Sequence, residues 1–243
     1  MSADAANPTN PSLILFDIDG TLMITKGASS RCMKRAGQMV LGPNFAWHPV
    51  TVGTLDPQIF DQLAHANGIL PTDAHRRQYQ SVYLEELEQE LTTRQNDITV
   101  LPGIASLIKS LHARATETGD VVLGVLTGNF RKATELKLQL SGLGLDRFPV
   151  IACAEHGECR NDLPKIAIQM ARQQTGYHIK TAHTILVGDT PRDIECAKAN
   201  GCKCVAVATG HYSAQQLKDA GGSTVVETLE DTEPLLALIN TAQ

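Results

Sequence analysis

The sequence predicts an α/β protein with a doubly wound parallel sheet, covered by helices on both faces, and a small helical domain inserted after the first strand. From about residue 101 onward, short apolar runs alternate with segments of helical periodicity, which is the pattern of such a sheet. Roughly 75 residues of helical pattern separate the first apolar strand from the second, far more than a strand-to-helix connection needs. We therefore expect these residues to form a small domain of their own.

The first strand is expected over residues 13–16, where four apolar residues in a row indicate a strand buried on both faces. Residues 1–12 are expected to form a disordered tail, because they lack the basic start and apolar segment of a secretion signal. The expected division is an α/β core of residues 13–24 and 101–243 and a helical domain of residues 25–100. No strand is expected in the helical domain.

The other elements are expected in order along the chain, with Leu101-Pro102-Gly103 marking the return from the helical domain to the core. Helices are expected at residues 29–41, 56–66, 72–94, 104–115, 131–140, 163–174, 191–199, 213–220 and 231–239. Strands are expected at residues 121–126, 149–152, 184–187, 203–207 and 224–226.

Composition excludes several classes of function. A net charge of -5 argues against a nucleic-acid backbone as partner, and 4% aromatic residues leave no stacking platform for single-stranded nucleic acid. The longest apolar runs fall far short of the ~20 residues that a membrane helix needs. The six cysteines lack the paired spacing of a zinc site, and we expect them to be reduced. A cytoplasmic protein is the expectation, and its oligomeric state is left open.

Two carboxylates one residue apart follow the first strand, in Asp17-Ile18-Asp19-Gly20-Thr21. Gly20 and Thr21 indicate that the chain is turning there, so the two side chains need not face the same way. A carboxylate can attack as a covalent nucleophile, and a neighbouring carboxylic acid can protonate the departing oxygen and later deprotonate water. On turn statistics alone, a solvated loop explains the same residues equally well.

Polar residues also follow two later strands. Thr127-Gly128-Asn129 comes after the apolar run 121–126, and Gly188-Asp189 through Asp193 comes after the run 184–187. In open parallel sheets the ligand crevice lies outside the carboxyl ends of the strands, so these segments are expected to converge there with Asp17.

These three segments resemble the motifs of the haloacid dehalogenase superfamily of phosphotransferases. Asp17 through Thr21 is similar to its first motif, Thr127-Gly128 to its second, and Gly188 through Asp193 to its fourth, over roughly residues 13–210. The resemblance implies a Rossmann-like core whose inserted helices form a cap over the active site. It also implies that Asp17 forms an aspartyl-phosphate and that Asp19 acts as acid and then as base.

Four aspartates gathered in one crevice would repel a phosphate, so they need a cation, and oxygen ligands with room for water suit Mg²⁺. The resemblance implies the side chains of Asp17 and Asp189 and the backbone carbonyl of Asp19 as ligands, with Asp193 supporting them from behind. Thr127 and the backbone amides of Gly128 and Asn129 can donate to the transferred phosphate, because a strand-to-helix turn presents unpaired N–H groups.

The third motif should be a cation that contacts the nucleophile and the phosphate, and two residues compete for this role. Lys165 lies off the expected buried face of its helix, whereas Arg160 lies in a loop at the carboxyl edge of the sheet. We favour Arg160, although a solvated cation is the usual state of either residue type.

The function expected from this pattern is a Mg²⁺-dependent phosphatase for a small phosphorylated metabolite, similar to phosphoglycolate phosphatases in layout. A phosphomutase with the same carboxylate pair is one alternative, and a non-catalytic binding module that retains the fold is another. Within the helical segment, Gly53-Thr54-Leu55-Asp56 is either a loop that approaches the substrate or, as the favoured interpretation, a plain helix N-cap. The substrate itself is left open.

Overall fold

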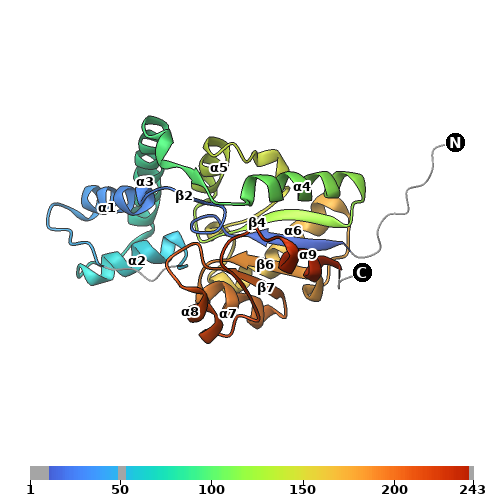
Figure 1. Cartoon of the computed structure of the whole chain (residues 1–243). Helices are drawn as coiled ribbons and strands as arrows, with labels where there is room; N and C mark the ends of the chain where they lie inside the picture. Colours follow the sequence, from blue (N-terminus) through green and yellow to red (C-terminus); the bar gives the residue numbers. More distant parts are fainter. Residues whose placement is uncertain (1–10, 49–52, 241–243) are drawn as a thin grey trace.

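A six-stranded parallel sheet forms the centre of the protein, whose computed structural model describes residues 11–48 and 53–240 (Figure 1). The strand order is β5-β4-β1-β6-β7-β8, and every neighbouring pair is parallel. The predicted doubly wound sheet is therefore confirmed. Its strands are β1 (Ser12–Phe16), β4 (Val121–Leu126), β5 (Val150–Ala152), β6 (Thr184–Gly188), β7 (Lys203–Val207) and β8 (Thr224–Val226).

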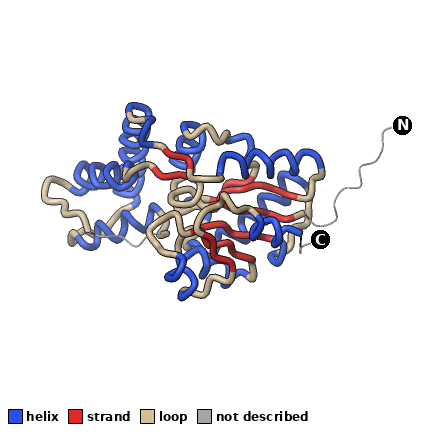
Figure 2. The backbone as a smooth tube through the Cα atoms, in the orientation of Figure 1, coloured by secondary structure: helices blue, strands red, loops and turns tan. Residues whose placement is uncertain are grey.

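Helices cover both faces of this sheet, as the tube view shows (Figure 2). In β1, Ile14 and Phe16 pack in one buried cluster and Leu13 and Leu15 in another, because successive side chains of a strand point to opposite faces. The first cluster includes residues of α4 (Ile104–Glu117), α5 (Arg131–Leu140) and α9 (Glu233–Asn240), and the second includes residues of α6 (Leu163–Thr175) and α7 (Pro191–Asn200). The short helix α8 (Ala214–Asp219) packs beside β7 and β8.

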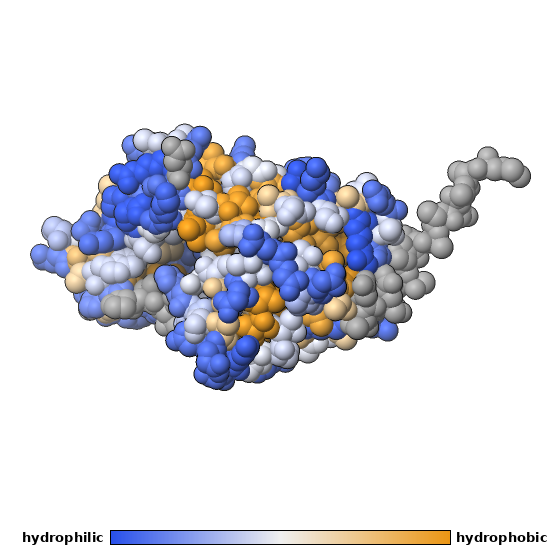
Figure 3. All heavy atoms as spheres, in the orientation of Figure 1, coloured by the Kyte–Doolittle hydropathy of each residue, from blue (hydrophilic) through white to orange (hydrophobic). Residues whose placement is uncertain are grey.

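The segment inserted after β1 consists of α1 (Ala28–Leu41), α2 (Asp56–Ala66) and α3 (Asp73–Thr93), which we call the cap helices. They share a buried cluster that also takes in Phe130 and Ala133 of the core. The face of α3 seen in the space-filling view is largely hydrophilic, whereas hydrophobic atoms gather over the core (Figure 3). Because the cap helices pack mainly on one another, we propose a core of residues 13–24 and 101–243 and a helical domain of residues 25–100.

Two details of the sequence expectation are corrected at the ends of these segments. The helical segment is joined to the core by a two-stranded antiparallel ribbon, β2 (Met23–Ile24) and β3 (Thr99–Val100), where no strand was expected. Strands of two residues are too short to give a periodic signal. Ser12, placed in the tail, is a buried residue of β1, while residues 1–10 lie outside the described part of the chain.

Strand order brings the polar turns together. β1 lies between β4 and β6, and its last residue, Phe16, pairs with Val125 on one side and Val187 on the other. The turns that follow these three strands therefore begin at the same edge of the sheet.

In the part of the chain that the structure describes, none of the helices has the length and the apolar character of a membrane span.

Candidate active site

The turn after β1 separates its two carboxylates. The Asp17 N–H donates to the Val187 carbonyl at 2.9 Å, which continues the strand pairing by one residue, and the Gly20 N–H then donates to the Met23 carbonyl at 2.9 Å. Gly20 has φ +83°, and a side chain there would collide with the Asp189 carboxylate. Because the chain turns this tightly, the two carboxylates of this turn reach different neighbours.

Asp17, Asp189 and Asp193 form a buried acidic cluster, with one oxygen atom from each lying within 4.8 Å of the others. Burial, then the charges of Asp17 and Asp193, raise the pKa of Asp189 to about 8. Burial also raises the pKa of Asp17, against the lowering effect of Arg160. Three buried carboxylates at this distance are stabilised by a hard divalent cation, so the donor set fits Mg²⁺.

Arg160 is the cation in direct contact with the Asp17 carboxylate. Its Nη2 donates to Asp17 Oδ2 at 2.8 Å and to Asp193 Oδ1 at 2.5 Å, and the residue is 6% exposed. Burial lowers the pKa of Arg160, but the adjacent Asp17 and Asp193 outweigh it and raise the pKa above the ordinary value. Asp193 is itself fixed at the start of α7, where it accepts hydrogen bonds from the Thr190 N–H and hydroxyl.

Lys165, the competing cation, lies exposed on α6 and does not line the cavity described below. Arg160 does line this cavity, and in the described part of the chain its Nε has no hydrogen-bond partner. An unpaired buried donor is costly, so this Nε is an unsatisfied polar group of the site.

The turn after β4 contributes Thr127, Gly128 and Asn129. Thr127 is completely buried, and its Oγ1 accepts a hydrogen bond from Asn129 Nδ2 at 2.8 Å. A Cβ atom at position 128 would lie 2.6 Å from the carbonyl oxygen of Thr54, which precedes α2. Glycine at position 128 therefore lets the segment before α2 lie close to this turn.

Asp19 is 41% exposed at its side chain and contacts Lys137, a residue that the sequence analysis missed. Lys137 Nζ lies 2.8 Å from Asp19 Oδ1 and 2.6 Å from Asp19 Oδ2. A signal was present in the sequence, because Ala133, Thr134 and Leu138 mark a buried face of α5 and Lys137 falls on the same face.

Asp56 links the cap helices to the turn after β4 and does not cap its own helix. Leu55 is the N-cap of α2; the Asp56 N–H donates to the Gly128 carbonyl at 2.8 Å, and Asp56 Oδ2 accepts from the Phe130 N–H at 2.8 Å. The favoured N-cap interpretation is therefore wrong. Burial raises the pKa of Asp56 to about 7, against the lowering effects of the Phe130 N–H and of Lys137.

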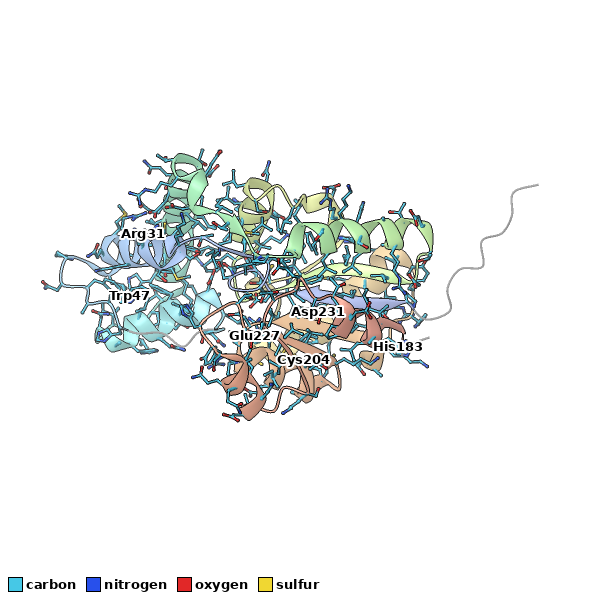
Figure 4. All side chains as sticks on the ribbon, in the orientation of Figure 1. Arg31, Trp47, His183, Cys204, Glu227 and Asp231 are labelled. Atoms are coloured by element: carbon cyan, nitrogen blue, oxygen red, sulfur yellow. The ribbon has the colours of Figure 1, made fainter. Side chains whose placement is uncertain are left out.

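The acidic cluster opens into a cavity of about 690 Å³ between the core and the cap helices. The core side includes Asp17, Asp19, Thr127, Asn129 and Arg160. The cap side includes the apolar residues Met33, Trp47 and Ile59 and the polar residues Ser29, Ser30 and Thr54; Figure 4 labels Trp47 beside the cap helices. Such a cavity can hold a small molecule with one end at the cluster and the other under the cap.

A profile of the family described as "Haloacid dehalogenase-like hydrolase" matches residues 14–207. The chain belongs to this family. Over 220 residues it is 27% identical to a protein named "Phosphoglycolate phosphatase" from Synechococcus elongatus, covering 90% of this chain and 93% of that protein. It is 24% identical over 218 residues to "Pyrophosphatase PpaX" from Oceanobacillus iheyensis, again covering 90% of this chain and 93% of that protein.

The fold of this hydrolase is shared with the crystal structure of β-phosphoglucomutase from Clostridium difficile. The TM-score is 0.70 at 17% identity, over 96% of this chain and 98% of the other. The family and its named phosphatase relatives confirm the predicted enzyme class, a phosphoric ester hydrolase.

Proposed function

We propose that this hydrolase is a Mg²⁺-dependent phosphatase that cleaves a small phosphorylated metabolite through an aspartyl-phosphate on Asp17. The carboxylate of Asp17 carries this proposal, because it lies buried at the carboxyl end of β1, bonded by Arg160 and open to the cavity. Its neighbours supply what phosphoryl transfer requires, namely positioning and neutralisation of the charge on the equatorial oxygens.

The Asp17 and Asp189 side chains and the Asp19 backbone carbonyl would hold the Mg²⁺ ion, with Asp193 supporting them. When bound, the ion neutralises charge, so an anionic nucleophile can approach an anionic substrate. Thr127 and the backbone amides of Gly128 and Asn129 bind the phosphate oxygens. Arg160 orients Asp17 through its Nη2 and places positive charge beside the phosphate.

Catalysis then proceeds in two displacements. In the first, an Asp17 carboxylate oxygen attacks phosphorus, the P–O ester bond breaks, and Asp19 gives its proton to the departing alkoxide. In the second, Asp19 takes a proton from water as the water oxygen attacks phosphorus. The Asp17–phosphorus bond breaks, which releases inorganic phosphate and restores the carboxylate.

A cavity of about 690 Å³ suits a metabolite-sized substrate. The names of the two relatives, phosphoglycolate phosphatase and pyrophosphatase, indicate classes with which to begin a substrate screen. The cytoplasm remains the compartment expected from the sequence.

The first test is hydrolysis of 4-nitrophenyl phosphate with Mg²⁺ and with a chelator. We expect turnover that requires the metal and is abolished in Asp17→Asn, while Asp146→Asn, at an exposed position, behaves as the parent. Turnover near the parent level in Asp17→Asn would remove Asp17 as nucleophile, and a wild type without turnover would favour the binding-module alternative.

A phosphomutase is the second candidate, supported by the shared fold with β-phosphoglucomutase. A mutase returns the phosphoryl group to the sugar, whereas a phosphatase gives it to water. Incubation with a hexose phosphate, followed by separation of sugar phosphate isomers and measurement of free phosphate, distinguishes the two. We expect free phosphate to exceed isomerised sugar.

A further inference from the structure

Lys137 is a completely buried cation in the last turn of α5, in contact with two side chains of the candidate site. We propose that Lys137 is a positioning residue that fixes the Asp19 carboxylate and the Asn129 amide in their working orientations. The proposal rests on the proposed function, because it takes Asp19 as the acid and base.

The hydrogen-bonding capacity of Lys137 is used completely. A lysine ammonium has three donors and no acceptor. Its Nζ contacts three oxygen atoms: Asp19 Oδ1 at 2.8 Å, Asp19 Oδ2 at 2.6 Å and Asn129 Oδ1 at 2.7 Å. Lys137 therefore contacts both carboxylate oxygens of Asp19 and the amide oxygen of Asn129.

The orientation of Asn129 follows from this contact. Because Lys137 can only donate, the amide oxygen of Asn129 must face it, and the amide nitrogen must face the other way. This nitrogen donates to Asp19 Oδ2 at 2.9 Å and to Thr127 Oγ1 at 2.8 Å. Thr127 Oγ1 thus acts as an acceptor toward Asn129, which leaves its hydroxyl proton for a phosphate oxygen.

Lys137 and Asp19 are buried to different extents. The Lys137 side chain is 0% exposed, whereas that of Asp19 is 41% exposed and lines the cavity. A buried ammonium pays a desolvation penalty that an apolar residue at the same position would avoid. The buried Lys137 holds the Asp19 carboxylate from one side and leaves it open toward the cavity, so the carboxylate has a fixed orientation for proton transfer.

The test compares Lys137→Met with Lys132→Met, an exposed lysine of the same helix. The readout is kcat/KM for an alkyl phosphate, whose leaving oxygen must be protonated, and for 2,4-dinitrophenyl phosphate, whose leaving group departs without a proton. We expect Lys137→Met to lose about 100-fold or more on the alkyl phosphate but less than about 10-fold on the aryl phosphate. Lys132→Met should match the parent on both.

An equal loss on both substrates, or no loss, would overturn the proposal, because a merely structural role does not depend on the leaving group. A second arm adds Lys137→Met to Asp19→Asn. If Lys137 acts through Asp19, the double variant has the same alkyl phosphate kcat/KM as Asp19→Asn alone, and a further loss of about 10-fold or more counts against it.

A crystal structure of Lys137→Met provides a readout without turnover. We expect the Asp19 carboxylate or the Asn129 amide to be turned from its present orientation, and unchanged orientations of both would contradict the proposal. Failure of the proposed function would instead appear as parent-level turnover in Asp17→Asn, whatever the result at Lys137. Thermal unfolding of each variant checks that it folds.

Discussion

At the scale of single residues, two aspartates one position apart have different chemistry because their neighbours differ. Asp17 lies within an acidic cluster and is bonded by Arg160, whereas Asp19 is bonded by Lys137 and Asn129 and is partly exposed to the cavity. This difference supports the proposed division of roles, a nucleophile at Asp17 and a proton carrier at Asp19.

Arg160 and Lys165 give a direct test of the proposed phosphate contact. Arg160→Ala should lower kcat/KM by about 100-fold or more, because it removes the positive charge beside the nucleophile. Lys165→Ala should change kcat/KM less than about 2-fold, since that side chain is exposed outside the cavity. A larger loss at Lys165 would reverse the assignment.

The sequence could predict the carboxylates of this site but not all of its cations. Asp17 and Asp189 follow apolar strands, and a parallel sheet brings such positions together whatever the details of packing. Lys137 follows no strand, and its place on the buried face of α5 is only a weak signal, because a lysine in a helix is usually solvated. Its contact with Asp19 depends on how α5 packs in three dimensions.

At the scale of elements, Asp56 connects the start of α2 to the turn after β4. The backbone and the side chain of Asp56 each make a hydrogen bond to this turn, so the cap helices are joined directly to the predicted phosphate-binding segment. The sequence predicted the helix but not this contact, because an N-terminal Asp is also the usual helix cap.

Asp56 should make stability depend on pH. Its pKa is about 7 in the folded chain against an ordinary 3.8, so the folded state holds the proton more tightly. Its stabilising contribution is therefore present below pH 4 and is lost as the pH rises toward 7. The free energy of unfolding of wild type relative to Asp56→Asn should fall by up to about 4 kcal/mol over that range.

Urea unfolding of both proteins at pH 5 and pH 8 measures the upper part of this change, which should amount to about 2.6 kcal/mol. Asp73→Asn is the control, since the side chain of Asp73 is 81% exposed at the start of α3, and its difference from wild type should stay within about 0.5 kcal/mol at both pH values. A pH-independent difference between wild type and Asp56→Asn would show that Asp56 is charged throughout.

At the scale of the whole molecule, strand order gathers residues that are far apart in the sequence. β1 lies between β4 and β6, so the turns that begin at Asp17, Thr127 and Asp189 meet at one edge of the sheet, beneath the cap helices (Figure 1). Alternating strands and helices were enough to predict a parallel sheet and the convergence of these turns, but not the order of the strands. The ribbon of β2 and β3 was missed because each strand has only two residues.

Removal of Mg²⁺ should destabilise the whole protein, because the ion relieves repulsion within the acidic cluster. Mg²⁺ at one hundred times its Kd should add about 2.7 kcal/mol to the free energy of unfolding, a rise in Tm of roughly 5–10 °C for a chain of this size. Asp189→Asn should unfold at a higher temperature than the metal-free parent and respond little to Mg²⁺. An equal response in both proteins would place the ion elsewhere.

The most direct measurement is the mass of the peptide that contains Asp17 after rapid acid quenching during turnover with Mg²⁺. We predict one added phosphoryl group on Asp17. With 2,4-dinitrophenyl phosphate, whose leaving group departs without a proton, we also predict a larger phosphorylated fraction in Asp19→Asn, in which water is no longer activated. Continued turnover with no phosphoryl group on this peptide, or with the group on another residue, would contradict the proposal that Asp17 attacks phosphorus.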